Sequence, residues 1–88
     1  MPGAVLLFLA TWASAICDPN QDAVREAAND LGLAYRTVDI DEFPDLAKAY
    51  GVLNVPAVTL EGDTTMPPII GARRAPVLIA LLLDRLAG

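Results

Sequence analysis

The feature that most constrains the fold is a continuous apolar run near the N-terminus, Val5-Leu6-Leu7-Phe8-Leu9. Successive side chains of a strand point to opposite faces of a sheet, so a strand that is apolar throughout must be buried on both faces. Such burial is typical of a parallel sheet with helices packed on each side. The surrounding segment, Ala4 to Ala15, is shorter than the roughly 20 residues of a transmembrane helix. We therefore expect a buried strand.

The same segment shares one property with signal peptides, because Ala13-Ser14-Ala15 fits their small-x-small cleavage pattern. A signal peptide normally has positive charge before its apolar run, and Met1-Pro2-Gly3 carries no charged side chain. We therefore expect a strand rather than a signal peptide, and a cytoplasmic protein.

Capping and turn residues divide the rest of the chain into further elements. Asp18-Pro19-Asn20-Gln21 is typical of a helix start, with Asp18 as the N-cap and Pro19 at the first helical position. Gly32 would end that helix, and a strand is expected over Ala34–Ile40. The later elements expected are a helix from Phe43 to Gly51, strands over Val55–Leu60 and Met66–Ile70, and a helix over Pro76–Leu86.

This order, β-α-β-α-β-β-α, predicts a single α/β domain over residues 1–88. The strand–helix–strand start requires a parallel crossover, whereas Glu61-Gly62-Asp63 is turn chemistry that brings the chain back antiparallel. Pro67 and Pro68 cannot donate backbone hydrogen bonds, so the returning strand should lie at a sheet edge. We expect a four-stranded mixed sheet with helices on both faces, the second helix on one face and the first and third on the other.

The composition excludes several kinds of function. Six basic against eleven acidic residues, for a net charge of −5, leave no basic patch for nucleic acid. One cysteine cannot form an internal disulfide, and without histidine the usual zinc ligand sets cannot be assembled. We expect no metal, no cofactor, no nucleic-acid partner and no membrane association.

Four segments, each on its expected element, resemble the thioredoxin superfamily in its short, glutaredoxin-sized form. They are Ala10-Thr11-Trp12, the passage from Gly32 to Asp41, Tyr50-Gly51-Val52-Leu53-Asn54-Val55-Pro56-Ala57-Val58, and Ile70-Gly71-Ala72. The resemblance implies the thioredoxin-like fold and a cis peptide bond before Pro56. It also implies a groove for an extended peptide or a low-molecular-weight thiol, formed by Trp12, Val55, Pro56, Ile70 and Gly71. Trp12 is expected to pack against the core or a loop or, alternatively, to cover the rim of the site.

The chemistry of this family needs a thiolate at the N-terminus of the first helix, usually within Cys-x-x-Cys. This chain has only Cys17, which fits two alignments. In the first, Cys17 is the nucleophile and Asn20 replaces the second cysteine; in the other, Ser14 replaces the nucleophile and Cys17 is the partly buried second thiol. The helix-start residues favour the first alignment, and the distance from Trp12 favours the second. A neighbouring carboxylate, Asp18, would raise the pKa of the thiol.

These residues leave three functional hypotheses: an enzyme, a binding module and a metal-cluster carrier. The first is a monothiol thiol–disulfide oxidoreductase, whose partner is a protein or low-molecular-weight thiol or disulfide. The alternative is a non-catalytic thioredoxin-fold binding module that uses the groove around Pro56. The third and least supported is an iron–sulfur carrier, since the chain lacks a Cys-Gly-Phe-Ser type of motif.

The last expected helix, Pro76–Leu86, is apolar almost all round. Leu78, Leu81, Leu82 and Leu86 would cover the sheet, which leaves Ile79 and Leu83 either exposed or in a homodimer or partner contact.

Overall fold

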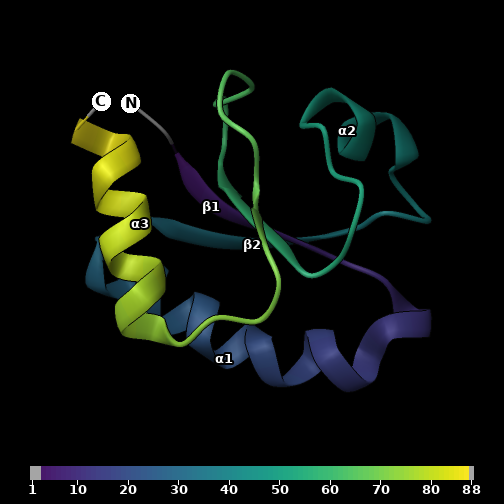
Figure 1. Ribbon diagram of the computed structural model, residues 1–88, viewed down its shortest axis with the longest axis horizontal. Coiled ribbons are helices and arrows are strands. Elements are labelled where there is room, and N and C mark those ends of the chain that lie inside the picture. Colours follow the sequence, from purple (N-terminus) through teal and green to yellow (C-terminus); the bar gives the residue numbers. More distant parts are fainter. Residues whose placement is uncertain (1–2, 88) are drawn as a thin grey trace.

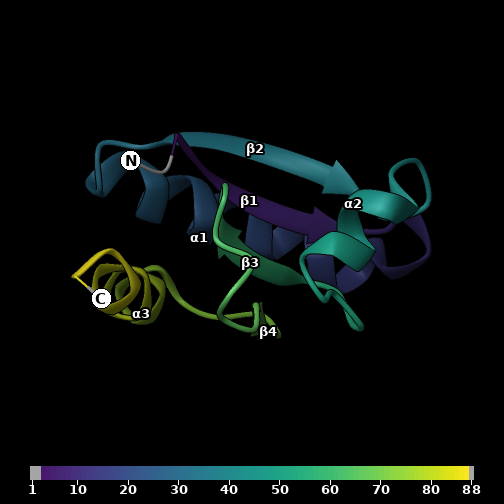
Figure 2. The same ribbon diagram turned by 90° about the horizontal axis from the view of Figure 1, so that it is seen from above.

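Strand β1 (Ala4–Leu9) lies inside a four-stranded sheet of order β2-β1-β3-β4 in the computed structural model, which describes residues 3–87. The predicted domain, 1–88, thus extends at both ends past the described residues. Strand β2 (Ala34–Asp39) is parallel to β1, whereas β3 (Ala57–Leu60) is antiparallel to β1 and β4 (Ile69–Ile70) is antiparallel to β3. Figure 2 shows the four strands side by side in this order. The predicted mixed sheet is therefore confirmed.

The apolar run of β1 is buried on both faces, as its composition predicts. Val5 and Leu7 pack with side chains from α1 (Ser14–Asp30) and α3 (Ala75–Ala87) in one core cluster. Leu6 and Phe8 point the other way and pack in a second cluster with Ala47, from α2 (Pro44–Ala49). Figure 1 shows α2 and α1 on opposite sides of the sheet. The predicted layering, with α2 alone on its face, is confirmed.

The start of α1 differs from the prediction. A short 3-10 helix, η1 (Thr11–Ala13), leads directly into α1 at Ser14, and Pro19 lies inside the helix. Asp18 does not cap the helix; its carboxylate instead accepts a hydrogen bond from the Gln21 side chain at 3.3 Å. The earlier start places Cys17 and Asn20 on the buried face of α1, together with Val24, Ala27 and Ala28. Burial of this face outweighs the local capping pattern, at the cost of one helical hydrogen bond that proline cannot donate.

Strand β4 is shorter than predicted. Only Ile69 and Ile70 pair with β3, whereas Pro67 and Pro68 lie before the strand. The missing proline N–H groups account for this, because they cannot extend the ladder towards Met66. The edge position of β4 agrees with the prediction.

Helix α3 also corrects two expectations. Leu78 and Leu82 are buried in the core as expected, but Leu81 and Leu86 are each 38% exposed. Ile79, expected to be left over, packs against the core cluster on the α1 side of the sheet. Leu83 is exposed, in line with one of its two expected environments. On the opposite face, Ala47 of α2 is buried against the sheet, whereas Leu46 is 38% exposed.

Between residues 3 and 87, no helix is both long and apolar enough to cross a membrane.

Candidate functional site

The candidate site begins where β1 ends and α1 starts. The N–H of Ala13 donates to the carbonyl of Ala10 at 3.0 Å, which closes the 3-10 turn that carries Trp12. The Trp12 side chain is 70% exposed, so the expectation that it packs against the core is wrong. The turn that carries Trp12 leads directly into the N-terminus of α1, so the exposed indole lies near the start of that helix.

The residues expected to hold the chemistry occupy different environments along α1. Ser14 is the first residue of α1 and is exposed. Cys17 lies three residues farther along and is only 1% exposed. The structure thus places a hydroxyl at the exposed helix N-terminus and the thiol inside the protein.

The second part of the site is the loop before β3. The Val55–Pro56 peptide bond is cis, and the carbonyl of Pro56 accepts a hydrogen bond from the N–H of Gly71 at 2.9 Å. Gly71 has φ +92°, a conformation that glycine adopts without steric cost. Figure 1 shows the two segments approaching each other above α1. The predicted residues Val55, Pro56, Ile70 and Gly71 are therefore brought together.

The backbone of Val55 has free hydrogen-bonding groups. In the described part of the chain, neither its N–H nor its carbonyl bonds to another backbone group. An unpaired backbone next to strand β3 can accept an additional extended segment.

Exposed apolar side chains occur on this loop, on β4 and on the first turn of α1. Leu53 is 90% exposed and Ile70 is 38% exposed, while Ile16 of α1 is 56% exposed. Nothing in the sequence marks Leu53 as a surface residue, because it stands in an apolar stretch that resembles a strand entry. Its exposure depends on the loop conformation, which only the structure shows.

Asn20 connects α1 to this region. Its side-chain Oδ1 accepts a hydrogen bond from the backbone N–H of Arg73 at 3.2 Å. The Arg73 guanidinium in turn donates to the carbonyl of Ile70, at 3.3 Å from Nε and 3.2 Å from Nη2. The sequence pointed to Asn20 as a replacement for the second cysteine and gave no sign of a contact between Asn20 and Arg73. Both residues instead hold the segment that carries Ile70 and Gly71.

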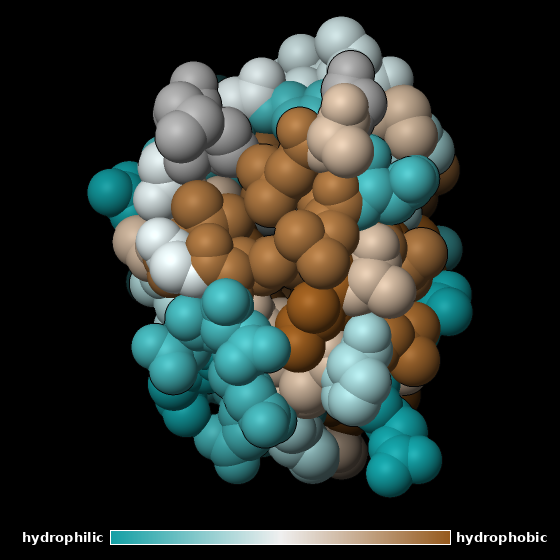
Figure 3. Space-filling view, turned by 90° about the vertical axis from the view of Figure 1, so that its left-hand side faces the viewer, coloured by the Kyte–Doolittle hydropathy of each residue, from teal (hydrophilic) through white to brown (hydrophobic). Residues whose placement is uncertain are grey.

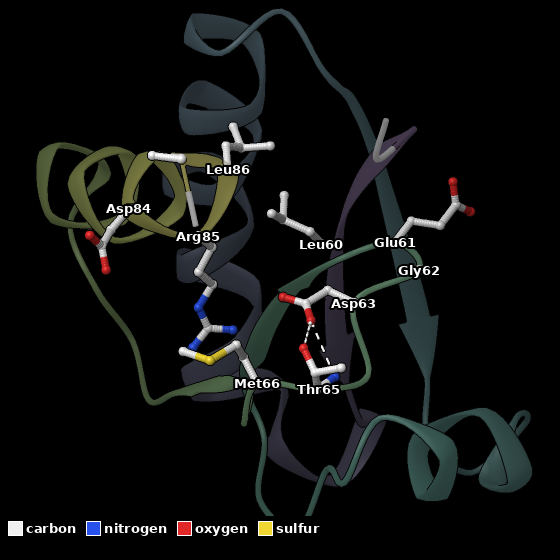
Figure 4. Close-up of a pocket in the computed structure, with 10 residues that line it drawn as sticks. Leu60, Glu61, Gly62, Asp63, Thr65, Met66, Asp84, Arg85 and Leu86 are labelled. Carbon is white, nitrogen blue, oxygen red and sulfur yellow. Dashed lines mark hydrogen bonds between the residues drawn. The ribbon is translucent and has the colours of Figure 1, made fainter.

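A separate pocket of about 870 Å³ lies away from these residues, between the β3–β4 loop and the end of α3. Figure 4 shows Arg85 reaching from α3 towards the loop that carries Asp63 and Thr65. Thr65 donates two hydrogen bonds to Asp63, from its hydroxyl at 2.9 Å and from its N–H at 3.2 Å. These bonds, chiefly the one from the hydroxyl, hold the pKa of Asp63 below its ordinary value, and Arg85 contributes in the same direction.

None of the predicted groove residues lines this pocket. In residues 3–87 there is also no group of three or more His, Cys, Asp or Glu side chains placed to hold a metal ion.

Comparisons with known proteins agree with this geometry. A family model described as a thioredoxin domain matches residues 15–66. Among solved structures, 107 chains match. A mutant thioredoxin from Halobacterium salinarum NRC-1 is 28% identical, with a TM-score of 0.76 over 92% of this chain and 72% of that one. A malarial protein is 27% identical, with a TM-score of 0.74 over 94% of this chain and 96% of that one.

Thioredoxin 1 from Thermosipho africanus TCF52B aligns over 96% of this chain and 93% of that one, with a TM-score of 0.72. At 16% identity, that likeness concerns the fold alone. No curated protein sequence matches the chain.

Proposed function

We propose that this chain, which belongs to the thioredoxin domain family, is a member without a redox cycle that binds an extended peptide segment. The binding groove is formed by Trp12, Val55, Pro56, Ile70 and Gly71. The observation that carries the proposal is the burial of Cys17, the only thiol of the chain, at 1% exposure.

Thiol–disulfide exchange requires an accessible thiolate. In a monothiol reaction, the Cys17 sulfur would attack one sulfur of a mixed disulfide, form a new S–S bond and release the other sulfur as a thiolate. An external thiol would then attack the new disulfide, release the Cys17 thiolate and take its place in a second disulfide. A buried sulfur cannot reach a substrate disulfide without a local opening of the helix.

The exposed position at the start of α1 belongs to Ser14. A helix N-terminus stabilises an anion within its first turn, which is the effect that lowers the pKa of reactive cysteines. A serine hydroxyl stays protonated near neutral pH and cannot form a disulfide. The burial of Cys17 therefore favours the alignment in which Ser14 replaces the nucleophile and Cys17 is the inner thiol.

The groove keeps the features needed for peptide binding without that chemistry. The free N–H and carbonyl of Val55 can pair with the backbone of an extended segment, and such pairing is largely independent of the side chains bound. The exposed side chains of Trp12, Leu53 and Ile70 supply apolar contacts on either side. Because the net charge is −5, we expect neutral or basic peptides to bind better than acidic ones.

Two-dimensional NMR tests peptide binding directly. Isotope-labelled protein is titrated with unstructured octapeptides of mixed apolar and basic sequence, and we expect the largest amide shifts at residues 53–56 and 70–72. Val55→Pro removes the donor N–H and should weaken binding about tenfold. Phe43→Ala is a control at an exposed apolar residue outside the groove, because Phe43 is 54% exposed and lies beside α2. Shifts confined to other surfaces would contradict the groove.

Alkylation kinetics test the absence of a redox cycle. We expect iodoacetamide to modify Cys17 slowly in the folded protein and rapidly in urea. Cys17→Ala should retain peptide binding. Fast alkylation of the folded protein at neutral pH, together with loss of disulfide reduction in Cys17→Ala, would instead establish the monothiol oxidoreductase.

A further inference from the structure

We propose that α3 is a self-association surface, through which two copies of this chain pair their α3 helices antiparallel across a two-fold axis. Val77 and Leu81 of each copy would pack between the helices, and Arg74 of one copy would face Asp84 of the other. This proposal uses none of the groove residues, so it stands or falls independently of the proposed function.

The outer surface of α3 is unusually apolar for a helix facing solvent. Val77 is 43% exposed and Leu81 is 38% exposed, although Leu78 and Leu82 fill the core on the inner side. Figure 3 shows a continuous hydrophobic area in the middle of the face on which α3 lies. A helix covering a sheet needs only one apolar stripe, so this second apolar surface calls for a partner.

Four exposed residues form a stripe along this surface. Arg74, Val77, Leu81 and Asp84 follow one another at spacings of three, four and three residues, which keeps them on one side of a helix. Arg74 immediately precedes α3, and its carbonyl already accepts hydrogen bonds from the N–H groups of Val77 and Leu78. The stripe therefore continues in helical register into the first turn.

The order of these residues identifies a second copy as the occupant. Arg74 and Asp84 lie equally far from the midpoint between Val77 and Leu81, with opposite charges at the two ends. An antiparallel copy of the same stripe therefore places Val77 against Leu81 and Arg74 against Asp84, and the two-fold axis makes each contact twice. Such charge complementarity fixes the orientation of the pair, since a parallel arrangement would bring like charges together.

Arg74 and Asp84 of one chain cannot form an ion pair with each other. Ten residues of helix separate them by about 15 Å along the axis. Over the described range, neither Arg74 nor Asp84 takes part in an ion pair or a side-chain hydrogen bond. Both are exposed and available for an intermolecular contact.

The size of the surface predicts a weak dimer. A helix of 13 residues is about 20 Å long, and a stable interface usually buries about 1,200 to 2,000 Å² in total. The area that a single pair of such helices can bury lies near or below the lower end of that range. We therefore expect self-association with a Kd of about 10 to 100 μM, in rapid exchange with the monomer.

Sedimentation equilibrium over protein concentrations spanning this range tests the proposal. Leu81→Glu should abolish the dimer. Arg74→Glu and Asp84→Arg should each weaken it about tenfold, because each places like charges face to face. The double variant Arg74→Glu/Asp84→Arg should restore the wild-type Kd, since the pair is then reversed but again complementary.

Two variants with the same changes of charge elsewhere serve as matched controls. Lys48→Glu and Asp41→Arg reverse exposed charges away from α3 and should leave the Kd unchanged. Circular dichroism checks that every variant is folded. A wild-type protein that stays monomeric throughout overturns the proposal, as does a dimer that Leu81→Glu leaves intact. A double variant no stronger than either single variant overturns the antiparallel arrangement.

Discussion

The side chain of Asn20 accepts a hydrogen bond from the backbone N–H of Arg73, with 3.2 Å between Oδ1 and N. The two residues are 53 positions apart, and the bond joins α1 to the segment that leads from β4 into α3. Asn20 is only 3% exposed, and its Nδ2 has no hydrogen-bond partner among the described residues. Of the four hydrogen bonds that this buried amide could make, the one to Arg73 is formed and holds the side chain in place.

We expect Asn20→Ala to lower the free energy of unfolding by about 1 to 2 kcal/mol. The substitution removes the acceptor for Arg73 and leaves a small space, and the loss of the unpartnered Nδ2 offsets part of the cost. Urea denaturation monitored by circular dichroism measures the change. Asn29→Ala, at an exposed position of the same helix, is the control and should change stability by less than about 0.5 kcal/mol. Equal effects of the two substitutions would contradict the role of Asn20.

Pro19 provides a test of where α1 begins. Inside a helix, proline removes one hydrogen bond and costs about 3 kcal/mol relative to alanine, whereas at the first helical position it is well tolerated. Since α1 begins at Ser14, we expect Pro19→Ala to raise the free energy of unfolding by about 1 to 3 kcal/mol. The same denaturation experiment measures it. Unchanged or reduced stability would mean that the helix starts at Pro19, as the capping residues alone suggest.

Adjacent leucines of α3 should differ sharply in their contribution to stability. Leu82 is fully buried in the core, whereas Leu83 is 50% exposed. Leu82→Ala should therefore destabilise the fold by about 2 to 5 kcal/mol, through lost burial and the resulting cavity. Leu83→Ala removes the same atoms and should cost less than about 1 kcal/mol. Thermal and urea unfolding at low protein concentration measures the stability of both variants. If Leu83→Ala were the more destabilising of the two, the orientation of α3 described here would be wrong.

The pKa of Asp63 should depend on Thr65. Removing the Thr65 hydroxyl in Thr65→Ala eliminates the main interaction that lowers this pKa, so the pKa should rise towards its ordinary value. Carbon-detected NMR titration of the carboxylate measures the change. Thr64→Ala is the control, because Thr64 makes no side-chain hydrogen bond to Asp63 in the described chain.

The lowered pKa of Asp63 also makes the free energy of unfolding depend on pH. Because the pKa of Asp63 is lower in the folded than in the unfolded chain, its contribution is fully present above the unfolded pKa. That contribution is lost as the pH falls through the lowered pKa of the folded state. Thr65→Ala should therefore make stability less dependent on pH in the acid range. An unchanged acid dependence, with an unchanged pKa, would contradict the role of the hydroxyl.

Local sequence patterns were sufficient for most of the fold. The apolar run of β1 is buried on both faces of the sheet. Backbone geometry explains the edge position of the prolines before β4 and the end of α1 at Gly32. Local patterns gave a wrong helix start where a capping preference competed with burial of the helix face. Asp18 and Pro19 form a good helix start, yet burial of Cys17 and Asn20 extends the helix back to Ser14.

The site shows the same division. Val55, Pro56, Ile70 and Gly71 could be identified because their segments resemble those of a known family, and the structure places them together. The exposure of Leu53 and the bond from Arg73 to Asn20 could not be predicted, and the sequence left the environment of Trp12 open. Each depends on how a short loop turns relative to the sheet, and apolar composition alone predicts burial.

By itself, the sequence determined the α/β architecture, because an all-apolar strand needs cover on both faces and the helical segments between the strands can supply it. It also determined that the chain has a single thiol and therefore no internal disulfide. Only the tertiary structure decided that this thiol is buried and that Ser14 takes the exposed position at the helix N-terminus. The physical reason is that the face of α1 that meets the sheet is set by packing in the core cluster that α1 shares with β1, β3 and α3, whose residues come from distant parts of the sequence.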